Sequence, residues 1–138
     1  MAAPRRLHLT APAPLEHATQ AAICRVLAIE IAAPGRLSRD GVCWFCIDIA
    51  DFAGVPGTRV ARGVIAGVPD LMALYQGRTF FIEIKRERTG ALSGPQQWLL
   101  PVLAAAGSHI GVARDAAETL ALLDSWGIPR AHRTTFAA

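Results

Sequence analysis

The apolar residues of the first third of the chain recur every three or four positions, which predicts a helix over residues 15–31. Pro34 and Gly35 follow this segment and predict its end. Residues 42–49 are almost continuously apolar, which is typical of a buried strand. Farther along, helical spacing returns at 95–106 and at 116–126, with a short strand predicted at 109–112 between them.

A β-hairpin is predicted between residues 71 and 85. Two segments flank Gln76-Gly77, which is suited to a tight turn: the apolar 71–75 and the segment 78–85, which is rich in β-branched and aromatic residues. Because strand side chains alternate, the second segment has one wholly apolar face that should contact the core. That face carries Phe80, Ile82 and Ile84, and the opposite face carries Phe81, Glu83 and Lys85.

These segments predict an α/β fold in which a small mixed sheet is flanked by helices, in the order αββαβα. The 138 residues suffice for one domain with one hydrophobic core, which we place at 14–127. Residues 1–13, rich in Ala and Pro, are expected to form a flexible arm, and residues 128–138 a C-terminal tail. The large side chains of Trp44, Trp98 and Trp126 are expected in the core.

The composition narrows the class of protein only moderately. Hydrophobic residues make up 52% and charged residues 18%, which excludes an intrinsically disordered chain. A net charge of +3 is compatible with a polyanionic partner without identifying one. No segment is expected to span a membrane, and no apolar signal core precedes the domain.

The three cysteines are expected to be reduced thiols of a cytoplasmic protein, because their number is odd and no secretory signal is present. Cys43 and Cys46 have CxxC spacing, but no second pair of Cys or His follows at the distance of a zinc ribbon. In a strand their side chains point to opposite faces. We therefore interpret them as buried structural cysteines.

Lys85 is the only lysine among the 14 basic residues of the chain. Arginine replaces lysine readily on a surface, but its guanidinium group is larger and planar. The single lysine thus indicates either a site that needs a compact ammonium group or a lysine that was retained by chance.

A two-residue turn at Gln76-Gly77 would place Asp70 directly opposite Glu83. Opposed residues have Cβ atoms about 4.5–5.5 Å apart, and like charges there are destabilising. Such a pair needs a cation between its members or a shifted pKa. Lys85 is one candidate cation and a divalent metal is the other, with oxygen ligands favouring Mg²⁺ or Mn²⁺ over zinc. A three-residue turn would instead separate the carboxylates, leaving a surface Asp and an exposed Glu–Lys strand face.

Three motifs together resemble the VRR-NUC domain of the PD-(D/E)xK nuclease superfamily. They are Gly67-Val-Pro-Asp70, Glu83-Ile-Lys85 and Leu92-Ser93-Gly-Pro-Gln96. The resemblance covers residues 15–126 and implies a restriction-endonuclease-like fold. Standalone members are typical of phages and bacteria, which implies the cytoplasm of a bacterial or phage-infected host cell. Residues 48–52 are more acidic and apolar than the family leads us to expect. The resemblance therefore does not extend to the substrate-facing loop.

The resemblance also implies roles for the residues of the metal site. Asp70, Glu83 and the backbone carbonyl of Ile84 would bind a catalytic Mg²⁺ or Mn²⁺. Lys85 would orient or activate the attacking water and offset charge on the phosphate. Glu16 matches the family's N-terminal acidic position and would hold a second metal or its water, with Glu30 as the competing candidate.

A glutamine and several arginines complete the expected site. Gln96 matches the motif glutamine and would orient water or Lys85, whereas the adjacent Gln97 should point elsewhere. Phosphate contacts are expected from arginines that flank the site, which would position DNA without reading its sequence. These are Arg59, Arg62, Arg86 and Arg88, with Arg5 and Arg6 on the arm as possible additions.

The expected function is a metal-dependent DNA endonuclease, structure-specific for Holliday junctions or other branched DNA in replication, recombination or repair. The resemblance implies a homodimer, whose two-fold symmetry would suit symmetric cuts. The alternatives are a catalytically inactive DNA-binding module of the same fold, a metal-binding or scaffold protein with a solvated Glu–Lys strand, and a nuclease that acts on RNA.

Overall fold

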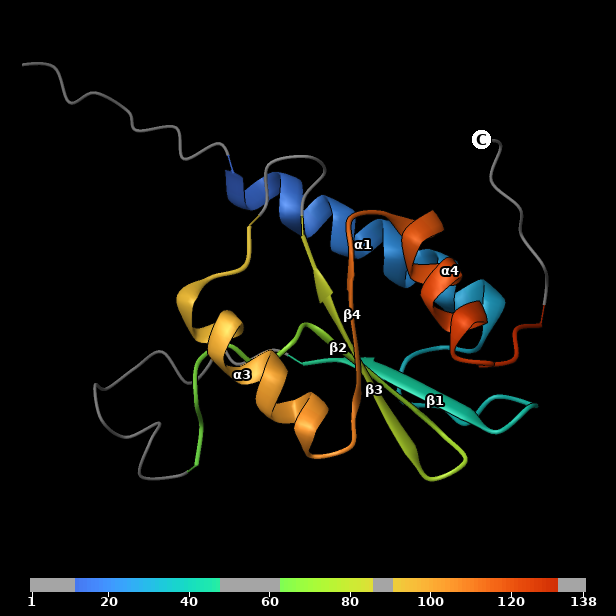
Figure 1. Ribbon diagram of the computed structural model, residues 1–138. Helices are drawn as coiled ribbons and strands as arrows, with labels where there is room; N and C mark the ends of the chain where they lie inside the picture. Colours follow the sequence, from blue (N-terminus) through green and yellow to red (C-terminus); the bar gives the residue numbers. More distant parts are fainter. Residues whose placement is uncertain (1–11, 48–62, 86–90, 132–138) are drawn as a thin grey trace, which may run out of the picture.

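The computed structural model describes residues 12–47, 63–85 and 91–131, with side chains described from residue 17 onward (Figure 1). Its element order is αβββαβα, so the predicted order αββαβα is one strand short. The difference lies in the hairpin 71–85, which that order counts once, whereas the structure has two strands there, as the predicted segments do. The elements are α1 (Pro12–Glu30), β1 (Val42–Cys46), β2 (Leu71–Tyr75), β3 (Arg78–Ile84), α3 (Gly94–Ala105), β4 (His109–Ala113) and α4 (Ala116–Ser125).

The sheet is mixed, in the order β1-β2-β3-β4, which confirms the predicted α/β class. Strand β2 is antiparallel to both of its neighbours, β1 and β3, whereas β3 and β4 run parallel to each other. A parallel pair needs a crossover connection, and α3 supplies it. Gln76 and Gly77 both have positive φ, 49° and 72°, as a two-residue hairpin turn requires. The predicted register is confirmed, since Tyr75 pairs with Arg78.

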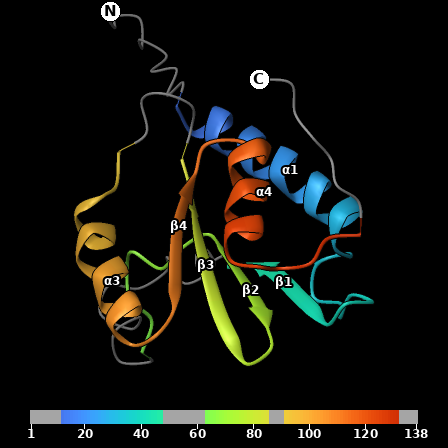
Figure 2. The same ribbon diagram turned by 45° about the vertical axis from the view of Figure 1, so that its right-hand side comes forward.

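Helices cover both faces of the sheet. In Figure 2, α1 and α4 lie side by side against one face, and α3 lies on the other side. The predicted apolar face of β3 contacts the main core, which confirms that assignment. The core is built from Ile23, Leu27, Val42, Trp44, Leu71, Ala73, Phe80, Ile82, Ile84, Ala113, Leu120 and Leu123, with contributions from Ile31 and Ile128.

The tryptophans do not all lie in the core. Trp44 is buried, and its indole Nε1 donates a hydrogen bond to the Ala32 carbonyl oxygen at 2.7 Å. Trp126 is half-buried and lies 5.2 Å from the ring of Phe80, centroid to centroid. Trp98 is 64% exposed, so the prediction for this residue was wrong. The reason is that the next two residues of α3, Leu99 and Leu100, occupy its buried side.

The ends of the domain extend slightly beyond the predicted boundaries. Helix α1 begins at Pro12, inside the predicted arm, where proline is tolerated in a first helical turn. Ile128, in the predicted tail, is buried, and Arg130 forms ion pairs with Glu30 at 3.0 Å and with Asp124 at 2.9 Å. The first residues after α4 therefore pack against the domain. In the described part of the chain, no helix combines the length and apolar character needed to cross a membrane.

Candidate active site

Asp70 and Glu83 meet where β2 begins and β3 ends. The last ladder pair of the two strands is Leu71 with Ile82, so one further step places Asp70 opposite Glu83. The Asp70 Oδ2 atom accepts a hydrogen bond from the backbone N–H of Ile84 at 2.8 Å. The carboxylate of Asp70 is thus fixed to the neighbouring strand. This is the pairing that the two-residue turn predicts.

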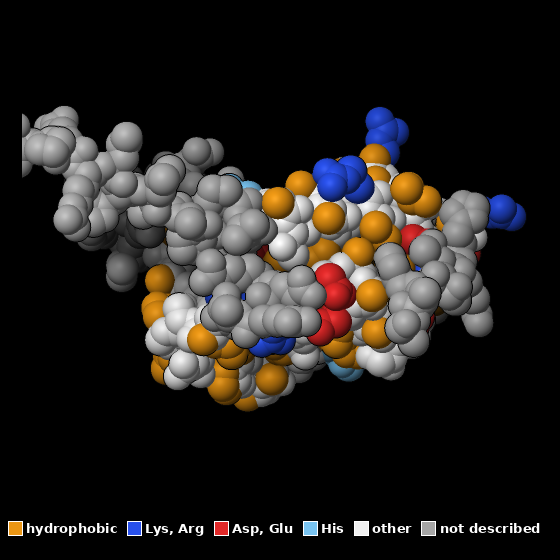
Figure 3. Space-filling model, turned by 90° about the horizontal axis from the view of Figure 1, so that it is seen from above, with side chains coloured by type: hydrophobic (Ala, Val, Ile, Leu, Met, Phe, Trp, Pro, Cys, Tyr) orange, Lys and Arg blue, Asp and Glu red, His pale blue; other side chains and the backbone are white. Residues whose placement is uncertain are grey.

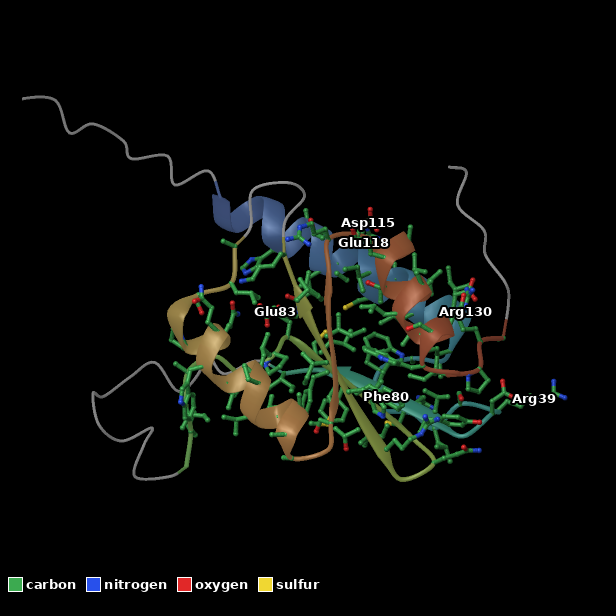
Figure 4. The ribbon with its side chains drawn as sticks, in the orientation of Figure 1. Arg39, Phe80, Glu83, Asp115, Glu118 and Arg130 are labelled. Carbon is green, nitrogen blue, oxygen red and sulfur yellow. The ribbon has the colours of Figure 1, made fainter. Side chains whose placement is uncertain are left out.

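Glu83 is buried beside Lys85, with side chains that face α3 rather than the main core. Only 1% of Glu83 and 8% of Lys85 is exposed, so the alternative of a solvated Glu–Lys strand face is wrong. Figure 4 shows Glu83 between the sheet and α3. Its Oε1 atom accepts a hydrogen bond from Gln96 Nε2 at 2.5 Å and lies 3.3 Å from Lys85 Nζ. Its Oε2 atom is buried and has no hydrogen-bond partner among the described residues.

Burial is the main cause that raises the pKa of Glu83, to about 8. The Asp70 carboxylate adds to the effect through its charge, and through a hydrogen bond that only protonated Glu83 can donate. Lys85 opposes both effects but does not cancel them. The pair therefore retains a proton near neutral pH unless a further positive charge is supplied.

Gln96 is oriented by the cap of the helix that carries it. The hydroxyl of Ser93 accepts a hydrogen bond from the backbone N–H of Gln96, and the Ser93 N–H donates to Gln96 Oε1 at 2.9 Å. This reciprocal capping box leaves the amide nitrogen of Gln96 free to donate to Glu83. Gln96 therefore contacts Glu83, a partner that the prediction did not name, and its predicted role in orienting water or Lys85 stays a prediction. The neighbouring Gln97 donates to the Leu92 carbonyl oxygen instead, which confirms that it points elsewhere.

Ser93 was missed as a residue that supports the site, although the sequence contains its signal. Ser-x-x-Gln directly before a helical pattern is a capping box at sequence level. Gly67 of the first motif has a similar supporting role. Its φ is +88°, and a Cβ atom there would lie 2.6 Å from the backbone carbonyl group of Pro95. The loop before Asp70 thus packs directly on the first turn of α3.

The donor set fits a hard divalent cation. The two carboxylates lie opposite each other, and Glu83 Oε2 is buried without a hydrogen-bond partner among the described residues. Within the described residues, no three His, Cys, Asp or Glu side chains converge. The third acidic side chain of the prediction, Glu16, lies outside the described part, although its backbone is in α1. The predicted role of the Ile84 carbonyl stays a prediction.

A pocket of about 440 Å³ opens beside Asp70, between α1 and the sheet. One face of α1 lines it, with residues spaced three or four apart, which is a signal that the sequence analysis did not use. Glu16 precedes Gln20 by one helical turn, at the same end of α1 as the pocket. Glu30, the competing candidate, lies at the other end in its ion pair with Arg130. The pocket is lined by His17, Gln20, Ala21, Cys24, Ile47 and Asp70.

The predicted DNA contacts fall outside the described residues. This applies to Arg59, Arg62, Arg86 and Arg88, to both arginines of the arm, and to residues 48–52. On the face shown in Figure 3, the described Lys and Arg side chains are scattered, and acidic side chains adjoin one another near its middle. A basic DNA-binding surface on that face would therefore need residues beyond the described ones.

Comparison of the chain with protein-family models, with curated protein sequences and with solved structures gave no match. What the site does is therefore argued from its own geometry. That geometry is a buried, paired carboxylate centre held by residues from β2, β3 and α3.

Proposed function

We propose that this protein is a metal-dependent endonuclease that hydrolyses phosphodiester bonds in DNA, with a restriction-endonuclease-like fold of the VRR-NUC type. One observation carries the proposal. The Glu83 carboxylate opposes Asp70, has one oxygen held by Gln96 and Lys85, and has its other, buried oxygen without a hydrogen-bond partner among the described residues. Burial and the charge of Asp70 make this pair keep a proton near neutral pH, and a bound divalent cation would take the place of that proton.

The proposed roles follow from these contacts. Asp70 and Glu83 hold Mg²⁺ or Mn²⁺, with Glu16 and the Ile84 carbonyl as the remaining ligands of the proposal. When bound, the metal supplies Lewis-acid chemistry and a more acidic water. Lys85 provides a fixed positive charge where negative charge develops on the phosphate.

Gln96 acts as a positioning residue in this proposal. Its amide holds Glu83 Oε1 and leaves Oε2 out of that hydrogen bond. The capping box with Ser93 fixes the orientation of that amide. The order of contacts is thus Ser93 to Gln96 to Glu83, and only the last of these would contact the metal.

The proposed substrate is branched DNA, such as a four-way junction or a flap, and the proposed assembly is a homodimer. The support is the mild basic charge of the chain and the arginines adjacent to the site in sequence. A two-fold axis would present two sites to a symmetric junction. These residues would contact phosphates, so selectivity would come from the shape of the DNA.

A cleavage assay tests the proposal. Labelled four-way junction, flap and linear duplex DNA are incubated with the protein in Mg²⁺, in Mn²⁺ and in EDTA. We expect metal-dependent cutting that Asp70→Ala and Lys85→Ala abolish and the exposed control Arg39→Ala retains. A preference for the junction would identify a resolvase, and equal rates a general nuclease. Binding without cutting in any metal would reject the proposal in favour of a DNA-binding module.

A further inference from the structure

Two cysteines from distant parts of the chain contact each other. Cys24 lies in α1 and Cys46 at the end of β1, and their Sγ atoms are 3.4 Å apart. All three cysteines are free thiols, as predicted, and all are half-buried, whereas Cys43 and Cys46 were predicted to be buried structural cysteines. Cys43 lies three residues before Cys46 in the same strand, so its side chain points to the opposite face of β1.

The thiol pair is reachable from solvent and lies next to the candidate active site. Cys24 lines the 440 Å³ pocket together with Gln20 and Asp70. Cys46 pairs with Leu71, the residue after Asp70, and the next backbone N–H, that of Ile47, donates to the Asp70 carbonyl oxygen at 2.8 Å. A small solute that enters the pocket therefore meets Cys24, whose sulfur contacts that of Cys46, beside the Asp70 segment.

We propose that Cys24 and Cys46 are a redox-active pair that closes to a reversible disulfide on reaction with a small-molecule disulfide such as oxidised glutathione. The Cys46 thiolate attacks one sulfur of the reagent, forming a mixed disulfide and releasing one glutathione thiolate. Cys24 then loses its proton and attacks the Cys46 sulfur, releasing the second glutathione. Two protein thiols are oxidised and one glutathione disulfide is reduced to two thiols. This inference goes beyond the proposed nuclease and does not depend on it.

The surroundings of the two sulfurs favour this order of attack. The hydrogen bond between the two sulfurs is the main cause that lowers the pKa of Cys46 to about 7; a hydrogen bond with Gln20 also lowers it, whereas burial and the negative charge of Asp70 raise it. The same contact is the main cause that raises the pKa of Cys24. Once Cys46 is part of a mixed disulfide, it no longer holds the proton on Cys24. The main cause of the raised pKa of Cys24 is then absent, so Cys24 can lose its proton and attack the mixed disulfide.

The contact already brings together the segments that the bond would join. The sulfurs touch, so closure needs a movement of somewhat more than 1 Å toward the roughly 2.05 Å of a disulfide. The bond would tie α1 to β1 beside the pocket. It would thereby restrict the movement of α1, which carries Gln20 and the backbone of Glu16, relative to Asp70.

Oxidation of the full-length chain in oxidised and reduced glutathione tests the proposal, with free thiols alkylated before mass spectrometry. We expect a folded product that has lost two hydrogen atoms, a single peptide link between Cys24 and Cys46, and its reversal by dithiothreitol. Cys43→Ser, the matched control, should form the same link. Cys24→Ser should instead stop at the mixed disulfide on Cys46.

Three outcomes would overturn the proposal. These are a link that includes Cys43 in the folded protein, glutathione adducts on all three cysteines with no internal link, and no reaction with a tenfold excess of oxidant. The same reaction in urea gives the unselective pattern of an unfolded chain for comparison. Since the readout is a peptide mass, the result is independent of whether the chain cleaves DNA.

Discussion

Glu83 lies in surroundings that are unusual for a carboxylate. It is buried in a central strand, and among the described residues its cationic partner, Lys85, and its amide donor, Gln96, share one oxygen. Ionised Glu83 would leave its other oxygen without a described partner, and desolvation of a charge is costly. This carboxylate therefore needs a proton or a further cation, which is the basis of the proposed metal site.

The raised pKa of Glu83, about 8 against an ordinary value of 4.5, predicts how the stability of the metal-free protein varies with pH. Between these values the folded state binds more protons than the unfolded state. The resulting stabilisation is complete below pH 4.5 and is lost as the pH rises toward 8, by at most about 1.4 kcal/mol per pH unit. Urea unfolding in EDTA from pH 5 to pH 8 measures the decline.

Glu83→Gln should flatten this pH dependence, because the titrating group is removed. Asp40→Asn, at an exposed position, should leave it unchanged. A decline of the same size in Glu83→Gln would assign the pH dependence to another group.

Lys85 shows how far a single residue could be interpreted from the sequence. Its uniqueness among the basic residues and its place two positions after Glu83 predicted a specific role, and its burial agrees with a residue that is not a solvated surface cation. Its actual partner atom could not be predicted. That depends on Gln96, which reaches the same oxygen from another element.

At the scale of elements, the contact between the Gly67 loop and α3 links the two halves of the site. Gly67→Ala should displace the first turn of α3, since a Cβ atom would lie 2.6 Å from Pro95. Gln96 would move with it, so we expect a loss of metal-dependent cleavage of about tenfold or more, because small misplacements are costly in catalysis.

Gly77→Ala is the matched control for this substitution. Gly77 also has a positive φ, +72°, but a Cβ atom there meets nothing within 4 Å. Both variants carry backbone strain and only one carries the clash. Equal cleavage rates in the two folded variants would show that the contact with α3 does not position the site.

The capping box of α3 gives a second prediction at this scale. Ser93→Ala removes the acceptor of the Gln96 N–H and should lower the free energy of unfolding by about 1 kcal/mol. The substitution also removes one restraint on the orientation of the Gln96 amide. The cleavage rate of Ser93→Ala should therefore fall, as should the rate of Gln96→Ala. Gln97→Ala, on the exposed side of the same turn, should keep the wild-type rate. An unchanged rate in Gln96→Ala would remove Gln96 from the site.

Much of the architecture could be predicted because its signals are local. The Gln76-Gly77 turn and the alternation in β3 set the hairpin register and hence the pairing of Asp70 with Glu83. Contacts between distant segments could not be predicted in this way. The approach of Gly67 to Pro95 and the contact of Cys24 with Cys46 depend on how α3 and α1 pack, which no local pattern specifies.

At the scale of the whole molecule, Arg130 connects the end of the described chain to the first helix. It bonds Glu30, which is fully buried, and Asp124, which is exposed (Figure 4). Arg130→Met would leave the Glu30 carboxylate without this partner, and we expect a loss of about 3 kcal/mol in the free energy of unfolding. Chemical denaturation measures it.

Arg39 serves as the control for Arg130, since Figure 4 shows its side chain extending away from the domain. Arg39→Met should change stability by less than about 0.5 kcal/mol, as is usual for exposed positions. If Arg130→Met were equally mild, the segment after α4 would not contribute to the stability of the domain.

The central claim is that the Asp70–Glu83–Lys85 centre cleaves DNA with a divalent metal. The most direct measurement is the single-turnover rate on a labelled four-way junction, in Mg²⁺ and in EDTA, for the wild type, Glu83→Gln and the control Asp40→Asn. We predict cleavage only in Mg²⁺, a loss of at least about 100-fold in Glu83→Gln, and the wild-type rate in Asp40→Asn. Cleavage that persists in folded Glu83→Gln, or in EDTA, would contradict the claim.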